Sequence, residues 1–139
     1  MASSLSSSLD PQGFHFSVST TVRLGAHTDR SVCSLHILHD LPPHVYADQY
    51  ELAQRPGYNS SLWGTADLER PVSAVDPRGS VLLLSVDGLH LSQLQHETVT
   101  LDVPLHARYG RPTERQDAPL HTVTLRRPLG FFACATDSE

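Results

Sequence analysis

Alternation between apolar and polar side chains is the clearest pattern along this chain. Between residues 14 and 24, Phe, Val, Thr and Leu at even positions alternate with His, Ser, Thr and Arg at odd positions. A period of two is typical of a strand with one buried face. Residues 33–37, 98–105 and 121–125 repeat the pattern, whereas residues 81–86 are apolar on both faces, as expected for a central strand of a sandwich.

Proline and glycine indicate where these strands end. Residues 40–43, Asp-Leu-Pro-Pro, close the second run because proline cannot donate to a sheet ladder, and Pro104 indicates an unpaired outer edge. Residues 43–53 are compatible with a short strand and a turn, 54–79 with a long loop that contains at most one short strand, and 89–97 with a helical turn. The sequence therefore predicts an all-β fold, a single-domain antiparallel β-sandwich with one long loop and at most short helical turns.

Length and composition fit one globular domain. The chain has 139 residues, of which 39% are hydrophobic and 18% charged. Serines at positions 3, 4, 6, 7 and 8 predict a flexible lead-in over residues 1–12, followed by the domain at 13–135 and a C-terminal end at 136–139. The start lacks the basic and apolar regions of a signal peptide, and no apolar run approaches the roughly 20 residues of a membrane span. We expect the chain as written to be soluble.

Charge and spacing argue against several kinds of chemistry. The net charge is −5 without a basic cluster, which excludes nucleic acid as an expected partner. The nine histidines form no His-x-His or His-Glu-x-x-His motif, and His36 and His39 fall on opposite faces of a strand. There is no Gly-x-Ser-x-Gly motif or phosphate-binding glycine loop, and carboxylates spaced like Asp48 and Glu51 are usually solvated. We therefore expect no metal, no cofactor and no catalytic residue.

Two further features, the cysteine pair and a glycosylation sequon, do not by themselves identify a function. Cys33 and Cys134 are either one long-range disulfide or two buried thiols, and composition slightly favours thiols because two cysteines in a chain of this length are ordinary. Asn59-Ser-Ser is a sequon for N-glycosylation within the predicted loop, where an acceptor must lie.

The stretch VPLHARYGRP (103–112) ends a predicted strand with several side chains that interfaces often use. Alternation places Leu105 inward and His106 outward, with Arg108 and Tyr109 where the strand ends. One interpretation is a tyrosine ring packed over a corner, with Arg108 bonded to carbonyls of a neighbouring loop. The other is a patch that faces a partner, because tyrosine and arginine are enriched in interfaces.

Two stretches together resemble the signatures of the PIG-X family. In LPPHVYADQYELA (41–53), a proline-rich turn precedes an aromatic, Asp, aromatic, Glu-Leu run, and VPLHARYGRP matches an apolar-Pro-apolar-His-x-Arg-Tyr-x-x-Pro run. The opening GFHFSVSTTVRL and the cysteine in SVCSLHIL also resemble that family. The resemblance extends from about residue 13 to residue 134, although Ala107 stands where some relatives are expected to have cysteine.

The resemblance implies a function without catalysis. PIG-X proteins are accessory subunits of the first mannosyltransferase of glycosylphosphatidylinositol (GPI) anchor synthesis in the endoplasmic reticulum. They have a luminal domain and a single C-terminal membrane span, which we do not expect within residues 1–139, and they bind and stabilise a multispanning catalytic subunit, PIG-M. A luminal position implies that Asn59 is a glycan acceptor and favours a Cys33–Cys134 disulfide over free thiols. The expected signature surface consists of Tyr46, Asp48, Tyr50, Glu51, His106, Arg108, Tyr109 and Pro112.

Two alternatives belong to other classes. The first is a free β-sandwich module that binds a glycan or a lipid head group. The second is a small hydrolase that uses a histidine and aspartate pair. Activity of the isolated protein on ester or glycoside substrates distinguishes the hydrolase from the other two.

Overall fold

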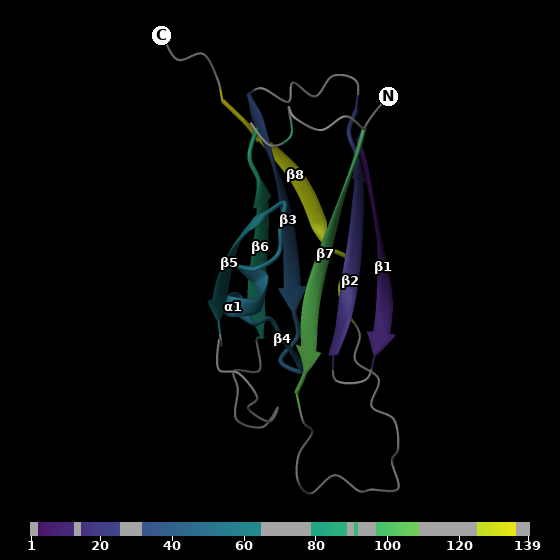
Figure 1. Ribbon diagram of the computed structural model, residues 1–139, viewed down its shortest axis with the longest axis vertical. Helices are drawn as coiled ribbons and strands as arrows, with labels where there is room; N and C mark the ends of the chain where they lie inside the picture. The colour runs from purple at the N-terminus through teal and green to yellow at the C-terminus, as the bar shows by residue number, and fades with distance from the viewer. Residues whose placement is uncertain are drawn as a thin grey trace, which may run out of the picture.

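The chain folds into two facing antiparallel sheets. The computed structural model describes residues 3–12, 15–25, 32–64, 79–88, 91, 97–108 and 125–135. Sheet A has the strand order β1-β2-β7-β4 and sheet B the order β5-β6-β3-β8 (Figure 1). The elements are β1 (Ser4–Gln12), β2 (His15–Arg23), β3 (Cys33–Leu41), β4 (Val45–Tyr46), α1 (Gln49–Leu52), β5 (Asn59–Gly64), β6 (Ser80–Val86), β7 (Thr98–Ala107) and β8 (Leu129–Cys134). The predicted all-β sandwich is confirmed.

The core lies between the two sheets and follows the period of two. On β7, Val99, Leu101 and Val103 are buried, and the same alternation buries one face of β2, β3 and β6. Each such aliphatic side chain contributes about 1.5–3 kcal/mol relative to exposure. Among the described residues, the largest fully buried side chains are Thr20, Leu35, Ile37, Leu41, Leu52, Leu82, Leu84, Val86, Leu91, Val103 and Leu105.

Sheet A is incomplete beside the end of β7. The short strand β4 pairs with β7 only at His106 and Ala107, so among the described residues no strand covers that edge at Pro104, as its proline indicated. The Tyr58 hydroxyl instead donates a hydrogen bond of 2.9 Å to the carbonyl of Asp102. Burial raises the pKa of Tyr58 to about 12, which keeps the hydroxyl protonated as a donor. A side chain thus satisfies a backbone acceptor that a longer β4 would otherwise pair.

The predicted flexible lead-in over residues 1–12 is wrong for Ser4–Gln12, which forms β1. This strand pairs with β2 along its whole length, from Ser4 opposite Arg23 to Gln12 opposite His15. Small polar residues suit an exposed edge strand, and Leu5 packs against the core. The serine-rich composition indicated a linker, but the hydrogen bonds offered by the edge of β2 determine the structure here.

The last predicted strand is displaced along the chain. Residues 121–124 lie outside the described residues, and 125–128 are not in a strand. The strand is instead β8, Leu129–Cys134, which pairs with β3. The predicted long loop contains the short strand β5, in agreement with the expectation of at most one, and residues 65–78 lie outside the described part. The short strand and turn expected over residues 43–53 are present as β4 and α1.

Cys33 and Cys134 form a disulfide that joins the ends of β3 and β8. The two residues are register partners in neighbouring strands and are separated by 101 positions in the sequence. The slight preference for free thiols from composition is wrong, whereas the family resemblance favours this pairing. In the described part of the chain, no helix is long and apolar enough to cross a membrane.

Candidate functional site: the His106 cluster

Three aromatic rings lie in one row across the outer face of sheet A. His106 on β7 has His15 of β2 as its register partner on one side and Tyr46 of β4 on the other. The Tyr46 and His106 rings are stacked, with centroids 5.0 Å apart and planes inclined by 13°. The rings of His15 and His106 meet edge to face at 4.1 Å. Backbone pairing therefore brings together side chains from three separate parts of the sequence.

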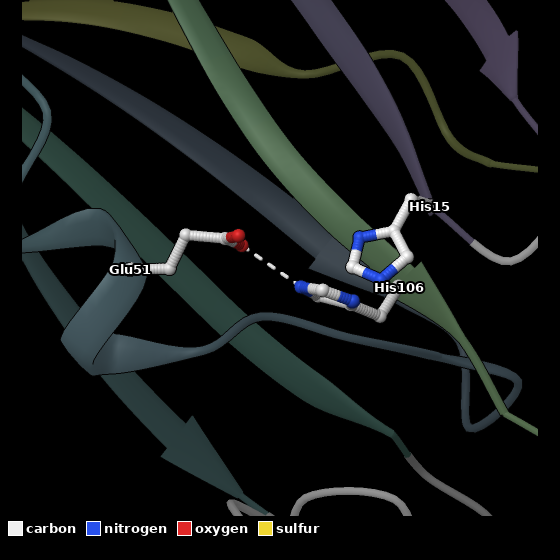
Figure 2. Close-up of side chains that lie close together, drawn as sticks. All are labelled: His15, Glu51 and His106. Carbon is white, nitrogen blue, oxygen red and sulfur yellow. Dashed lines mark hydrogen bonds and ion pairs between the residues drawn. The ribbon is translucent and has the colours of Figure 1, made fainter.

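The short helix α1 adds a carboxylate to this row. Asp48 caps the helix, since its Oδ1 accepts a hydrogen bond of 2.9 Å from the backbone N–H of Tyr50. Leu52 anchors the helix in the core. Between these two fixed positions, Glu51 points at His106, and its Oε1 lies 2.8 Å from His106 Nε2 (Figure 2). The cap and the anchor together determine where this carboxylate lies.

Arg108 completes the group from the end of β7. Its guanidinium carbon lies 4.7 Å from the centroid of the Tyr46 ring, a distance typical of a cation–π contact. The backbone N–H of Arg108 donates a 2.7 Å hydrogen bond to the carbonyl of His44, just before β4. The two signature stretches of the sequence therefore pack directly against each other. We call His15, Tyr46, Glu51, His106 and Arg108 the His106 cluster.

Most of this cluster is buried, which corrects the expectation for His106. Alternation gave the right face, opposite Leu105, but His106 is only 9% exposed because Tyr46 and Glu51 lie against it. Tyr46 is 8% and Arg108 6% exposed. Packing at a corner therefore describes these three residues better than an open patch does, and the ring in that corner is Tyr46.

The remaining signature residues differ in their surroundings. Asp48 is half-buried and caps α1, whereas Tyr50 is 79% exposed. Tyr109 and Pro112 lie outside the described residues. Asn59 begins β5 and is exposed, as a glycan acceptor requires.

Sequence reasoning did not identify His15 as part of this site. Glu51 and His106 are 55 positions apart, and His15 belongs to a different strand, so no local spacing links the three. The ligand atoms of His15, Glu51 and His106 nevertheless all lie within 4.8 Å of one another. The pairing of β2 with β7 brings the two histidines together, and the position of α1 adds Glu51. Chemically, two imidazoles and a carboxylate can share a proton or hold a divalent cation.

A second feature is a cavity of about 290 Å³ beside β1, with His39 in its lining. His39 is buried, and its Nε2 has no hydrogen-bond partner among the described residues. Burial lowers the pKa of His39 from 6.5 to about 4, so the ring is neutral at physiological pH. Asp40 and Arg126, which form an ion pair of 3.2 Å, line the same cavity. Among the described residues, none that lines this cavity belongs to the His106 cluster.

Comparison with known proteins gives the family of this chain. The family model described as PIG-X / PBN1 matches residues 11–139. The protein pbn1 of Schizosaccharomyces pombe is 30% identical over 93% of this chain, and that of Neurospora crassa is also 30% identical over 93%. The chain spans only 40% and 26% of the lengths of these two relatives. The match across nearly the whole sandwich, both signature stretches included, shows that this chain belongs to the PIG-X / PBN1 family.

Proposed function

We propose that this chain is the luminal domain of a non-catalytic accessory subunit of the GPI α-1,4-mannosyltransferase in the endoplasmic reticulum. It binds and stabilises the catalytic subunit, of the PIG-M type, in GPI-anchor biosynthesis. Attachment to the membrane is through a span outside residues 1–139. The observation that carries the proposal is the family match over residues 11–139, which contains both signature stretches.

The way in which the signature stretches pack supports a binding role. Tyr46, His106 and Arg108 are buried against one another and fix the end of sheet A. The same packing places α1 at the surface, where Tyr50 is exposed. Tyrosine is a frequent anchor of interfaces because it buries a large area at a low entropic cost. In this proposal, the buried signature residues present Tyr50 to the partner.

The outer face of sheet B offers the larger area that a stable interface requires. A specific interface buries about 800 Å² on each partner, far more than one tyrosine side chain provides. Outward-facing apolar side chains lie on all four strands of this sheet, whereas the outer face of sheet A carries mostly Ser, Thr and Asp. The apolar residues are Leu38, Trp63, Val81, Leu83, Leu129 and Phe131. Trp63, Leu129 and Phe131 are exposed and the other three are half-buried. Exposed apolar surface often marks a protein or membrane contact.

Two observations support a luminal position. The Cys33–Cys134 disulfide is typical of an oxidising compartment. Asn59, the acceptor of the Asn-Ser-Ser sequon, is exposed on the edge strand β5 and therefore accessible to a glycosyltransferase. The mobility of the protein from a eukaryotic host, before and after enzymatic removal of N-glycans, tests this. The Asn59→Gln variant is expected to abolish the shift, and wild-type protein without a shift contradicts luminal glycosylation.

Stabilisation of the partner follows from mass action. A subunit that binds only the folded catalytic chain adds RT ln(1 + [L]/Kd) to its apparent stability, about 2.7 kcal/mol at a concentration 100 times Kd. Removal of this protein from cells is therefore expected to lower the amount of the catalytic subunit, and GPI-anchored proteins at the cell surface with it. If the catalytic subunit stays abundant and active, the proposed function is wrong.

A matched pair of variants tests the binding surface. Tyr50→Ala is expected to reduce co-purification with the catalytic subunit, whereas Gln49→Ala, at the preceding exposed position of α1, is expected to leave it unchanged. The thermal unfolding of both variants is measured in parallel, because neither side chain is buried. Equal co-purification of the two variants excludes Tyr50 as a contact.

A further inference from the structure

We propose that His15, Glu51 and His106 form a binding site for Zn²⁺ that joins β2, β7 and α1. The three residues come from three elements, and their ligand atoms all lie within 4.8 Å of one another (Figure 2). Figure 2 shows the carboxylate of Glu51 directed at His106 from the side of α1, with His15 on the neighbouring strand. The proposal does not depend on the identity of the partner protein.

The donor set matches the chemistry of zinc. Two histidines and one carboxylate form a ligand set found in three-ligand zinc sites, with the fourth position open to water. Neutral imidazole and carboxylate also suit a borderline cation better than Ca²⁺ or Mg²⁺, which take mainly oxygen ligands. A divalent cation further offsets part of the net charge of −5 of this chain.

Two of the ligands are held by the fold before any metal binds. His15 and His106 face each other as register partners, so the ladder between β2 and β7 fixes the separation of their backbones, and side-chain rotation adjusts the distance between the two rings. The stacked ring of Tyr46 limits rotation of the His106 ring. Rigid elements and packed neighbours are the conditions under which a metal site is preorganised.

The adjustments needed for tetrahedral coordination are small. Zinc bonds of about 2.0–2.1 Å place ligand atoms about 3.4 Å apart. The 2.8 Å separation of Glu51 Oε1 from His106 Nε2 must widen slightly, and the other ligand atoms, which lie within 4.8 Å, need to move by no more than about 1.4 Å to reach this spacing. Glu51 is half-buried and His15 exposed, so rotation of these two side chains supplies the movement and leaves a path for the ion. The buried His106 remains the fixed point.

Sequence motifs predict no metal site, because the known motifs consist of ligands that are close together in the chain. A site whose ligands come from paired strands has no such spacing. The hydrogen bond between His106 and Glu51 connects the two ligands in the metal-free protein. When zinc binds, it takes the place of the proton in this hydrogen bond.

The experiment titrates the disulfide-intact chain with zinc chloride by calorimetry at pH 7.5, and separately with Co²⁺, whose visible absorption reports tetrahedral coordination. One ion per chain is expected. His15→Asn and Glu51→Gln are each expected to weaken binding by more than about 100-fold, because even outer-shell partners of metal ligands are worth roughly 10–100-fold. His15 is exposed at the end of β2, so His15→Asn is expected to fold like the wild type.

The matched control is His44→Asn, which removes an exposed histidine outside the three-ligand group. It is expected to leave zinc affinity unchanged. If wild-type protein binds no zinc, or if His15→Asn binds as tightly as His44→Asn, the proposed site is wrong. Thermal unfolding in the presence of zinc gives an independent readout, since only proteins that bind the ion in the folded state gain stability.

Discussion

Replacement of Tyr46 by alanine is expected to lower the free energy of unfolding by about 3–4 kcal/mol. The side chain is only 8% exposed, and truncation of a buried aromatic residue typically costs about 3–5 kcal/mol. Part of this loss comes from the stacked ring of His106, at about 0.5–1.5 kcal/mol, and from the Arg108 guanidinium, at about 0.5–2 kcal/mol. The loss is a large fraction of the 5–15 kcal/mol that typically stabilises a domain.

Urea unfolding followed by tryptophan fluorescence and circular dichroism measures this effect. With a slope near 2 kcal/mol per M, typical for small proteins, the midpoint is expected to fall by about 1.5–2 M. Tyr46→Phe keeps the ring and is expected to lose no more than about 1.5 kcal/mol, the usual range for one hydrogen-bonding group. The comparison separates the contribution of the stacked ring from that of the hydroxyl.

Tyr50→Ala is the matched control, because the same substitution is made four positions later at a side chain that is 79% exposed. Its expected effect on unfolding is within about 0.5 kcal/mol, as for most surface positions. If Tyr46→Ala also costs less than about 1 kcal/mol with an unchanged slope, the ring does not pack as described. Tyr46 and Arg108 would then belong to an open surface and not to the fold.

Two further predictions concern the disulfide and the buried histidine. The double variant Cys33→Ser, Cys134→Ser is expected to lose about 4–5 kcal/mol, because the bridge spans 101 positions, and an equal urea midpoint for variant and wild type would contradict this. His39 stays neutral in the folded state down to about pH 4, while the unfolded chain takes up a proton below about 6.5, so stability is expected to fall by roughly 3 kcal/mol as pH decreases through this range. His39→Leu is expected to show a shallower decrease in unfolding experiments between pH 7 and 4, and identical slopes for the two proteins refute the assignment.

Much of the fold follows from local pattern. A period of two assigns each strand residue to one face, and this was enough to place Leu105 inward, His106 on the opposite face, and residues 81–86 in a central strand. Proline at position 104 indicated the edge that β4 leaves uncovered. The signature stretches gave the family, because short runs of specific residues in a fixed order are a property of the sequence alone.

Other features depend on contacts between distant residues. The serine-rich start has no strand pattern of its own and becomes β1 only because β2 offers an unpaired edge. Cys33 and Cys134 become partners because β3 and β8 are neighbours, which composition cannot reveal.

The His106 cluster has features that follow from local sequence pattern and features that depend on tertiary contacts. The sequence determined that His106 points away from the core, because side chains alternate along any strand. Only the tertiary structure decided that the residue is buried, since burial depends on what packs over that face: here Tyr46 from β4 and Glu51 from α1. The same holds for His15, which meets His106 through strand register, a relation between distant segments that no local pattern encodes.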